Sequence, residues 1–197
     1  MPKHSLPRHI TTTHRDRDWQ EVERFSRSVQ DYPVCTTITG DPGAIASGSP
    51  GALSTITWSP PTNPLFDTHN MLGGAATTDV RIPKDGFYSF WMAFRFGDNP
   101  INNRTEFVVL FYTAKTSETG YGAPSFSEGP MRCSRTFDGS THITADAYFT
   151  ADFRGVELHQ DDLVQFGVKV YGTQTLNAVT VSVAEFRYLF PIPQGNV

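Results

Sequence analysis

The fold is decided by the stretch Asp79-Val80-Arg81-Ile82-Pro83-Lys84-Asp85-Gly86-Phe87-Tyr88-Ser89-Phe90. It is preceded by Phe66-Asp67-Thr68-His69-Asn70-Met71. A turn with Pro83 and Gly86 leads into an aromatic run that continues to Phe96. Successive side chains of a strand point to opposite faces, and here both sets are rich in apolar groups. Such a strand lies inside a sandwich, or its outer face is covered by another subunit. The two alternating sets are Tyr88, Phe90, Met92, Phe94, Phe96 and Phe87, Ser89, Trp91, Ala93, Arg95.

The composition favours an all-β domain. The chain has 197 residues, enough for one domain with its own core and an appendage. It contains 15 Phe, 16 Gly and 14 Pro, and only 18% of its residues are charged. No apolar run approaches the roughly 18 residues of a membrane span, and the first nine residues contain no secretion-like apolar segment. We therefore expect no membrane association and a protein that stays where it is made or leaves by another route.

Strand-like segments separated by turns fill the chain after residue 52. Several show clear alternation, as in Val164, Phe166, Val168 and Val170. Strands at this spacing without helical intervals predict an antiparallel sandwich or barrel. The expected strands are Leu53–Trp58, Thr77–Ile82, Gly86–Phe96, Thr105–Thr113, Thr141–Phe153, Asp162–Tyr171 and Ala178–Phe190.

Residues 1–51 read as an N-terminal arm that ends in a linker rich in Gly and Pro. Within it, residues 16 to 31 predict one short amphipathic helix, since apolar residues recur at spacings of three and four. A helix this short is not stable alone, so its stripe must dock on its own domain, on sister copies or on another protein. The stripe, which we expect to anchor the protein, is Trp19, Val22, Phe25, Val29 and Tyr32.

The first seventeen residues are basic, with Lys3, Arg8, Arg15 and Arg17 against only Asp16. Such an arm suits an acidic protein surface or nucleic acid, and a solvated terminus explains it equally well. We do not expect nucleic acid among the partners.

Candidate chemistry is sparse. Asp67 and His69 share a face if they lie on a strand, so the carboxylate could orient the imidazole. No nucleophile motif accompanies them, and a turn closed by the Asp and Asn side chains explains the segment better. His142 and His159 lack metal-ligand spacing, and we expect no metal and no cofactor. Cys35 and Cys133 show no framework, which favours free thiols over a disulfide.

The longest irregular segment of the head is expected at residues 115 to 135. Loops longer than about 12–15 residues are often functional, so this one is the candidate for contact with a partner. Its large side chains are Tyr121, Phe126 and Met131.

Four motifs together resemble a known family. They are Pro83-x-x-Gly86-x-Tyr88-x-Phe90, the pattern of Leu158, Asp162 and Val164, the aromatic ending Phe186–Phe190, and the strand order. The segment from residue 52 to 193 resembles the globular head of complement-type and tumour-necrosis-factor-type proteins. Phe66–Met71 resembles the version found in structural proteins of tailed bacteriophages. Gln160-Asp161-Asp162 departs from the usual Gly-Asp turn, and Pro191-Ile192-Pro193 departs from the usual ending.

The resemblance implies a ten-stranded jelly roll over residues 52–197 that forms a tight homotrimer. It also implies a non-enzymatic virion component, made in the host cytoplasm, that decorates the head or forms a head or tail fibre. Residues 1–33 would bind the major capsid or tail protein, and a host-cell receptor is a further partner left open. The alternative is a host-encoded trimeric ligand for a protein or glycan receptor. We expect the threefold axis to be lined by Tyr88, Phe90 and Tyr188.

Overall fold

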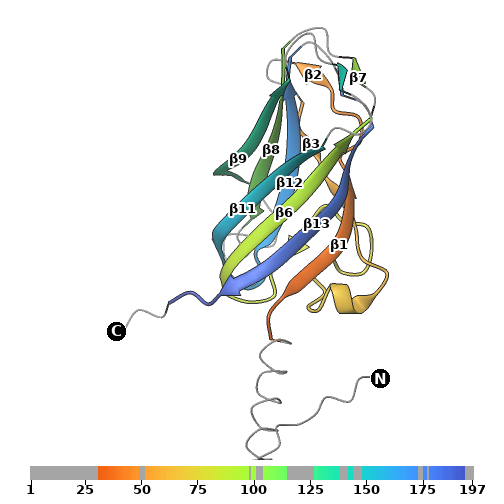
Figure 1. Cartoon of the computed structure of the whole chain (residues 1–197). Coiled ribbons are helices and arrows are strands. Elements are labelled where there is room, and N and C mark those ends of the chain that lie inside the picture. Colours follow the sequence, from red (N-terminus) through yellow and green to blue (C-terminus); the bar gives the residue numbers. More distant parts are fainter. Residues whose placement is uncertain are drawn as a thin grey trace, which may run out of the picture. The chain divides into compact units, whose positions relative to one another are not determined.

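A computed structural model shows the chain as two separate units, residues 1–32 and 33–197 (Figure 1). Residues 31–48, 52–97, 99–100, 104–114, 127–137, 142–143, 148–172, 175–176 and 178–193 are described. Of the predicted helix only Asp31 is described, in a turn, and Trp19, Val22, Phe25 and Val29 lie outside the described residues. We call residues 33–197 the head and describe it by itself.

The described elements are almost entirely strands, joined by turns and one short 3₁₀ helix. They are β1 (Val34–Asp41), β2 (Ser47–Gly48), β3 (Ser54–Thr55), β4 (Thr57–Ser59), η1 (Pro64–Phe66), β5 (Val80–Arg81), β6 (Gly86–Phe96), β7 (Asn99–Pro100), β8 (Thr105–Ala114), β9 (Ser127–Phe137), β10 (His142–Ile143), β11 (Tyr148–Leu158), β12 (Leu163–Tyr171) and β13 (Val179–Phe190). Within this described set no helix is long and apolar enough to cross a membrane.

Two sheets form the head. The first has the order β11-β6-β13-β1-β4, and the second has the order β2-β12-β8-β9, with β3 and β5 also paired to β12. The long strands pair antiparallel, and the chain changes sheet between β6 and β8, β9 and β11, β11 and β12, and β12 and β13. This connectivity is that of a jelly roll, so the predicted all-β class and antiparallel jelly-roll fold are confirmed.

An aromatic core fills the space between the sheets. Phe166 on β12 lies at its centre, with ring centroids 5.3 Å from Phe90, 5.4 Å from Phe111 and 5.8 Å from Trp58. These rings are fully or almost fully buried and pack edge-on or tilted, the arrangements that aromatic quadrupoles favour. The core is large enough to hold the head together without a metal or a disulfide.

The head begins earlier than predicted. β1 pairs with β13 and β4 inside the first sheet, so the head starts at Pro33 and not at residue 52. The register of β1 shifts between Cys35 and Ile38, where Thr37 has a φ of 57°. This bulge places the two buried residues three apart, which hides the alternation that would otherwise reveal a strand.

The predicted loop at residues 115 to 135 is also partly wrong, because its second half belongs to β9. β9 is the last strand of its sheet and contains Gly129 and Pro130. An edge strand tolerates residues that would break a central strand, since one side of its backbone is unpaired.

Candidate interaction surfaces of the head

The side chains predicted to line a threefold axis lie instead in the core of a single copy. Tyr88 and Phe90 are 0% exposed and Tyr188 is 7% exposed in the isolated chain. They have almost no surface left to bury against a second copy, so this part of the prediction needs correction. The named residues of β6 lie on its inner face, and a shift of one residue along a strand exchanges its two faces.

The opposite set of β6 side chains forms the outer face of the first sheet. Ser89 and Arg95 belong to that set, and these polar residues were the sequence signal that it faces outward. Its large side chains are Phe87 and Trp91, both half-buried. The sequence analysis missed both as candidates for an interaction surface.

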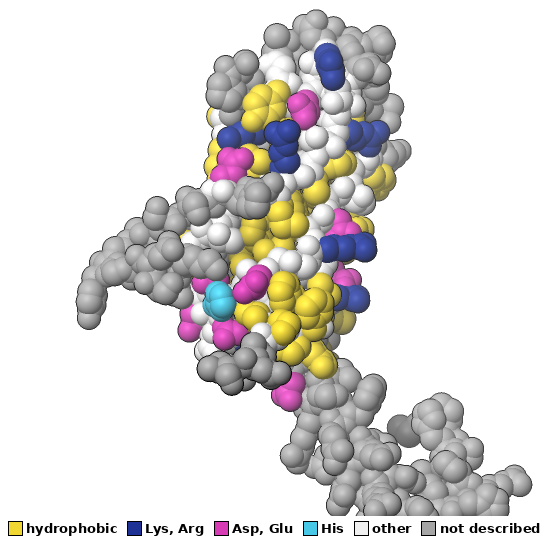
Figure 2. Space-filling model, turned by 90° about the vertical axis from the view of Figure 1, so that its left-hand side faces the viewer, with side chains coloured by type: hydrophobic (Ala, Val, Ile, Leu, Met, Phe, Trp, Pro, Cys, Tyr) yellow, Lys and Arg dark blue, Asp and Glu magenta, His cyan; other side chains and the backbone are white. Residues whose placement is uncertain are grey.

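Phe87, Leu189 and Phe190 form an exposed apolar cluster at one end of this face, which we call the base patch. The rings of Phe87 and Phe190 lie 4.8 Å apart at 30°, and Phe190 and Leu189 are 50% and 40% exposed. Pro33, the first residue of the head, accepts a hydrogen bond from the backbone N–H of Tyr188 at 2.9 Å. The base patch therefore lies beside the point where the chain enters the head. Figure 2 shows a gathering of hydrophobic side chains, with acidic ones beside it, at the lower end of the visible face.

A depression of about 370 Å³ lies farther along the same face, around Trp91. In the register of the sheet Trp91 is flanked by Asp152 on β11 and by Glu185 on β13. Each carboxylate is paired with an arginine of its own strand: Asp152 Oδ2 accepts from Arg154 Nε at 2.6 Å, and Glu185 pairs with Arg187. The lining, which we call the Trp91 depression, is Ser89, Trp91, Asp152, Arg154, Glu185, Arg187 and Leu189.

Asp67 has a structural role in the loop between β4 and β5. Its Oδ1 accepts from the backbone N–H of Met71 at 2.7 Å, and its Oδ2 accepts from that of Leu72 at 3.0 Å. The imidazole Nδ1 of His69 lies 2.8 Å from the hydroxyl of its neighbour Thr68. The part of the turn explanation that concerns Asp67 is confirmed, because its carboxylate closes the loop on its own backbone.

Cys35 lies against the same carboxylate. Burial, together with the nearby charge of Asp67, raises the pKa of the Cys35 thiol far above its usual value. Such a thiol stays protonated and is a poor nucleophile at neutral pH. Cys133 is half-buried, and both cysteines are free thiols, as the sequence favoured.

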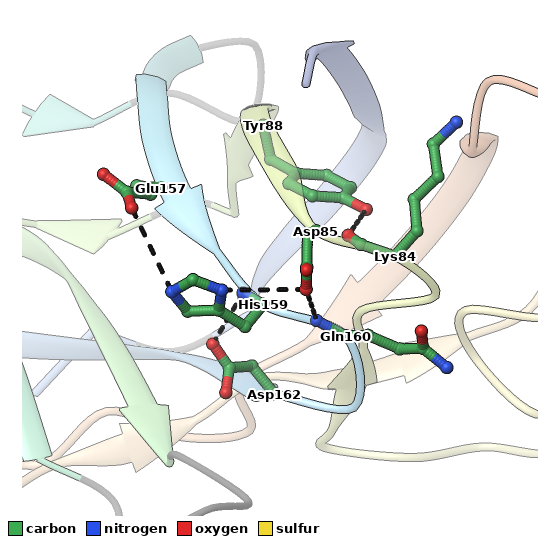
Figure 3. A network of polar contacts seen from close by, with 7 residues as sticks. All are labelled: Lys84, Asp85, Tyr88, Glu157, His159, Gln160 and Asp162. Atoms are coloured by element: carbon green, nitrogen blue, oxygen red, sulfur yellow. Dashed lines mark hydrogen bonds and ion pairs between the residues drawn. The ribbon is translucent and has the colours of Figure 1, made fainter. Parts of the chain in front are cut away.

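His159 lies at a corner where two turns meet (Figure 3). Its Nδ1 lies 3.6 Å from Asp85 Oδ1, and its Nε2 lies 4.0 Å from Glu157 Oε1. Asp85 Oδ1 also accepts from the backbone N–H of Gln160 at 2.7 Å. These contacts tie the turn before β6 to the turn between β11 and β12. In the described residues, His, Cys, Asp and Glu form no group of three or more that could hold a metal.

The unusual Gln160-Asp161-Asp162 turn keeps the geometry that a glycine would normally provide. Asp161 has a φ of 69°, a left-handed conformation that Asp adopts more readily than most residues. Its backbone N–H donates to the carbonyl of Ile82 at 2.7 Å, and the carbonyl of Asp162 accepts from the N–H of Ile82 at 2.9 Å. The departure from the family pattern therefore leaves this turn intact.

Of the predicted partner-contact residues, Tyr121 and Phe126 lie outside the described residues. Met131 lies on β9, half-buried against the core. Tyr32 of the anchoring stripe is 42% exposed. The prediction that this loop contacts a partner therefore stays a prediction.

The fold and these surfaces define a jelly-roll head with an exposed aromatic face. No family model matches the chain, and no curated protein matches it. The head is similar to three solved structures: the TNF Eiger from S. frugiperda (10% identity, TM-score 0.43, 84% of this chain and 99% of that chain), murine APRIL (16%, 0.39, 81% and 100%) and the xylan-binding module CBM15 (12%, 0.34, 81% and 98%). The fold assignment rests on the strand order and not on these similarities.

Proposed function

We propose that the chain is a non-enzymatic structural component of a tailed-phage virion, a trimeric knob anchored to the particle through its N-terminal arm. The phage assignment rests on the sequence resemblance of Phe66–Met71, and the head-or-tail location is left open. The observation that carries the assembly part is the base patch beside Pro33.

The base patch is suited to a threefold contact. Full burial of a large apolar side chain that is exposed to water contributes about 1.5–3 kcal/mol of favourable free energy. Burial of the half-exposed Phe190 therefore contributes roughly half of that. Phe87, Leu189 and Phe190 from three copies would together supply several such contributions around one axis. Because the chain enters the head here, the three arms would start close to the same axis.

A structural role also fits the candidate chemistry. Both carboxylate oxygens of Asp67 are engaged by backbone N–H groups, and the Cys35 thiol is buried. The thiol is therefore closed to a substrate, and the carboxylate, although it lines a surface depression, holds the loop on its own backbone. These observations support a protein that acts by binding.

Attachment to particles tests the anchoring part. Deleting residues 1–32 should leave a soluble, cooperatively folding head, because β1 to β13 carry their own core, and should abolish incorporation into particles. Trp19→Ala combined with Phe25→Ala should do the same by removing the two largest groups of the stripe. Tyr148→Ala, which removes a 52% exposed ring of β11, is the matched control and should incorporate normally.

Salt gives a second measurement. If Arg8, Arg15 and Arg17 meet an acidic shell surface, attachment should weaken as ionic strength rises. A truncated head that still decorates particles normally would refute the anchoring role. It would place the attachment surface on the head, whereas a full-length protein that never attaches to particles would favour the alternative, a host-encoded trimeric ligand that binds a receptor.

A further inference from the structure

We propose that the Trp91 depression is a binding site for a neutral saccharide. This inference goes beyond the proposed function and does not require it, because every residue that lines the depression comes from one copy of the chain. The volume of about 370 Å³ is within the roughly 300–1,000 Å³ of typical ligand pockets.

Trp91 provides the floor of the site. It is half-buried on a sheet face that is otherwise open, so part of its ring is available to a ligand. A pyranose ring has one face rich in C–H groups, which carry partial positive charge and pack against the negative face of an indole. Ligand hydroxyls at the ring edge would then point toward the two neighbouring strands.

Asp152 provides an unsatisfied acceptor at the edge of that floor. Within the described part of the chain, its Oδ1 is buried and has no hydrogen-bond partner, although Oδ2 is bound to Arg154. A buried acceptor without a donor is costly, and such groups in a folded protein call for a missing partner. Because Oδ1 is closed even to a water molecule, a ligand hydroxyl placed over Trp91 can donate to this oxygen only after the Asp152 side chain turns toward the depression.

The charges around Trp91 favour a saccharide over a second protein surface. Asp152 and Glu185 each carry an arginine partner, so the depression contains two carboxylates and two guanidinium groups and is balanced in charge. Covering these ion pairs with apolar side chains would remove them from water without replacing its hydrogen bonds. A polyhydroxyl ligand supplies both donors and acceptors, and a neutral one suits the balanced charge.

The base patch shows the contrasting composition. Phe87, Leu189 and Phe190 bring no charged group of their own, so their burial by another protein has no such cost. Leu189 lies where the two areas meet, and apart from it they are suited to different partners: a protein at the base and a saccharide at Trp91.

The test is binding of the full-length protein to an array of bacterial surface polysaccharides and neutral hexasaccharides of glucose, xylose, galactose and mannose. The strongest ligand is then titrated by calorimetry. We expect binding by the wild-type protein, at least a tenfold loss in Trp91→Ala, and a smaller loss in Asp152→Asn. Thr150→Ala, an exposed change on β11 outside the depression, is the control and should bind like wild type.

Circular dichroism and thermal unfolding establish that each variant is folded. If Trp91→Ala fails to fold, Arg154→Ala and Asp152→Asn carry the test, since both side chains lie on the edge strand β11. Absence of binding to every array member at 10 mM ligand would overturn the proposal. So would equal binding by folded Trp91→Ala. Loss of the oligomer in Trp91→Ala would overturn it as well, by assigning the depression to a protein contact.

Discussion

Removing the Asp67 carboxylate should destabilise the head without affecting any catalytic step. In Asp67→Ala, the backbone N–H groups of Met71 and Leu72 lose their acceptor. A hydrogen bond to a charged group contributes about 1.5–3 kcal/mol, and water replaces part of it at this half-buried site. We therefore expect the free energy of unfolding to fall by about 2–4 kcal/mol, below the simple sum of two bonds.

The assay is urea denaturation followed by tryptophan fluorescence, with thermal unfolding as a second measurement. For a domain of this size, the expected loss corresponds to a decrease in Tm of about 5–15 °C. Asp67→Asn keeps one acceptor oxygen and should lose about half as much free energy. His69→Ala removes a contact with the neighbouring hydroxyl and should change stability by less than about 1 kcal/mol.

A stability of Asp67→Ala within about 0.5 kcal/mol of wild type would refute the structural role of this carboxylate. Detection of esterase, glycosidase or phosphatase activity that both Asp67→Ala and His69→Ala abolish, while both variants stay folded, would revive the catalytic alternative.

Two further predictions concern the core. Phe166→Ala should cost about 3–5 kcal/mol in urea denaturation because it empties the centre of the aromatic core, whereas Phe166→Leu should cost clearly less; equal costs would contradict the packing described here. The raised pKa of Cys35 means that above about pH 8.5 the unfolded chain loses a proton that the folded chain keeps, so stability should fall by about 1.4 kcal/mol per pH unit. Between pH 8.5 and 10 this slope should be smaller in Cys35→Ala, and identical slopes in the two proteins would contradict a buried, protonated thiol.

The long central strands were predictable from the sequence because they are long apolar runs bounded by turn residues, and β12 alternates with a period of two. β6 was predicted with its observed ends, and the antiparallel jelly roll followed from the motifs around it. β1 was missed because its bulge at Thr37 breaks the alternation, and β9 was missed because an edge strand accommodates Gly129 and Pro130.

The interaction surface was harder to predict than the fold. Both sets of side chains on β6 are largely apolar, so hydrophobicity alone does not say which set faces the core. The burial of the side chains in the structure distinguishes the two sets: Tyr88 and Phe90 pack inside, and Phe87 and Trp91 face outward. The Trp91 depression combines residues of three strands that are far apart in the sequence. A local sequence motif therefore cannot predict such a site.

The mass of the protein in solution tests the central claim most directly. Sedimentation equilibrium at micromolar concentration should give three times the chain mass of 21.9 kDa for the wild-type protein. Phe87→Ala combined with Phe190→Ala should dissociate the trimer or weaken it strongly while the head stays folded, and Tyr148→Ala should leave it unchanged. A wild-type protein that sediments as a 21.9 kDa monomer, or a double variant that keeps the full trimer, would contradict a knob assembled through the base patch.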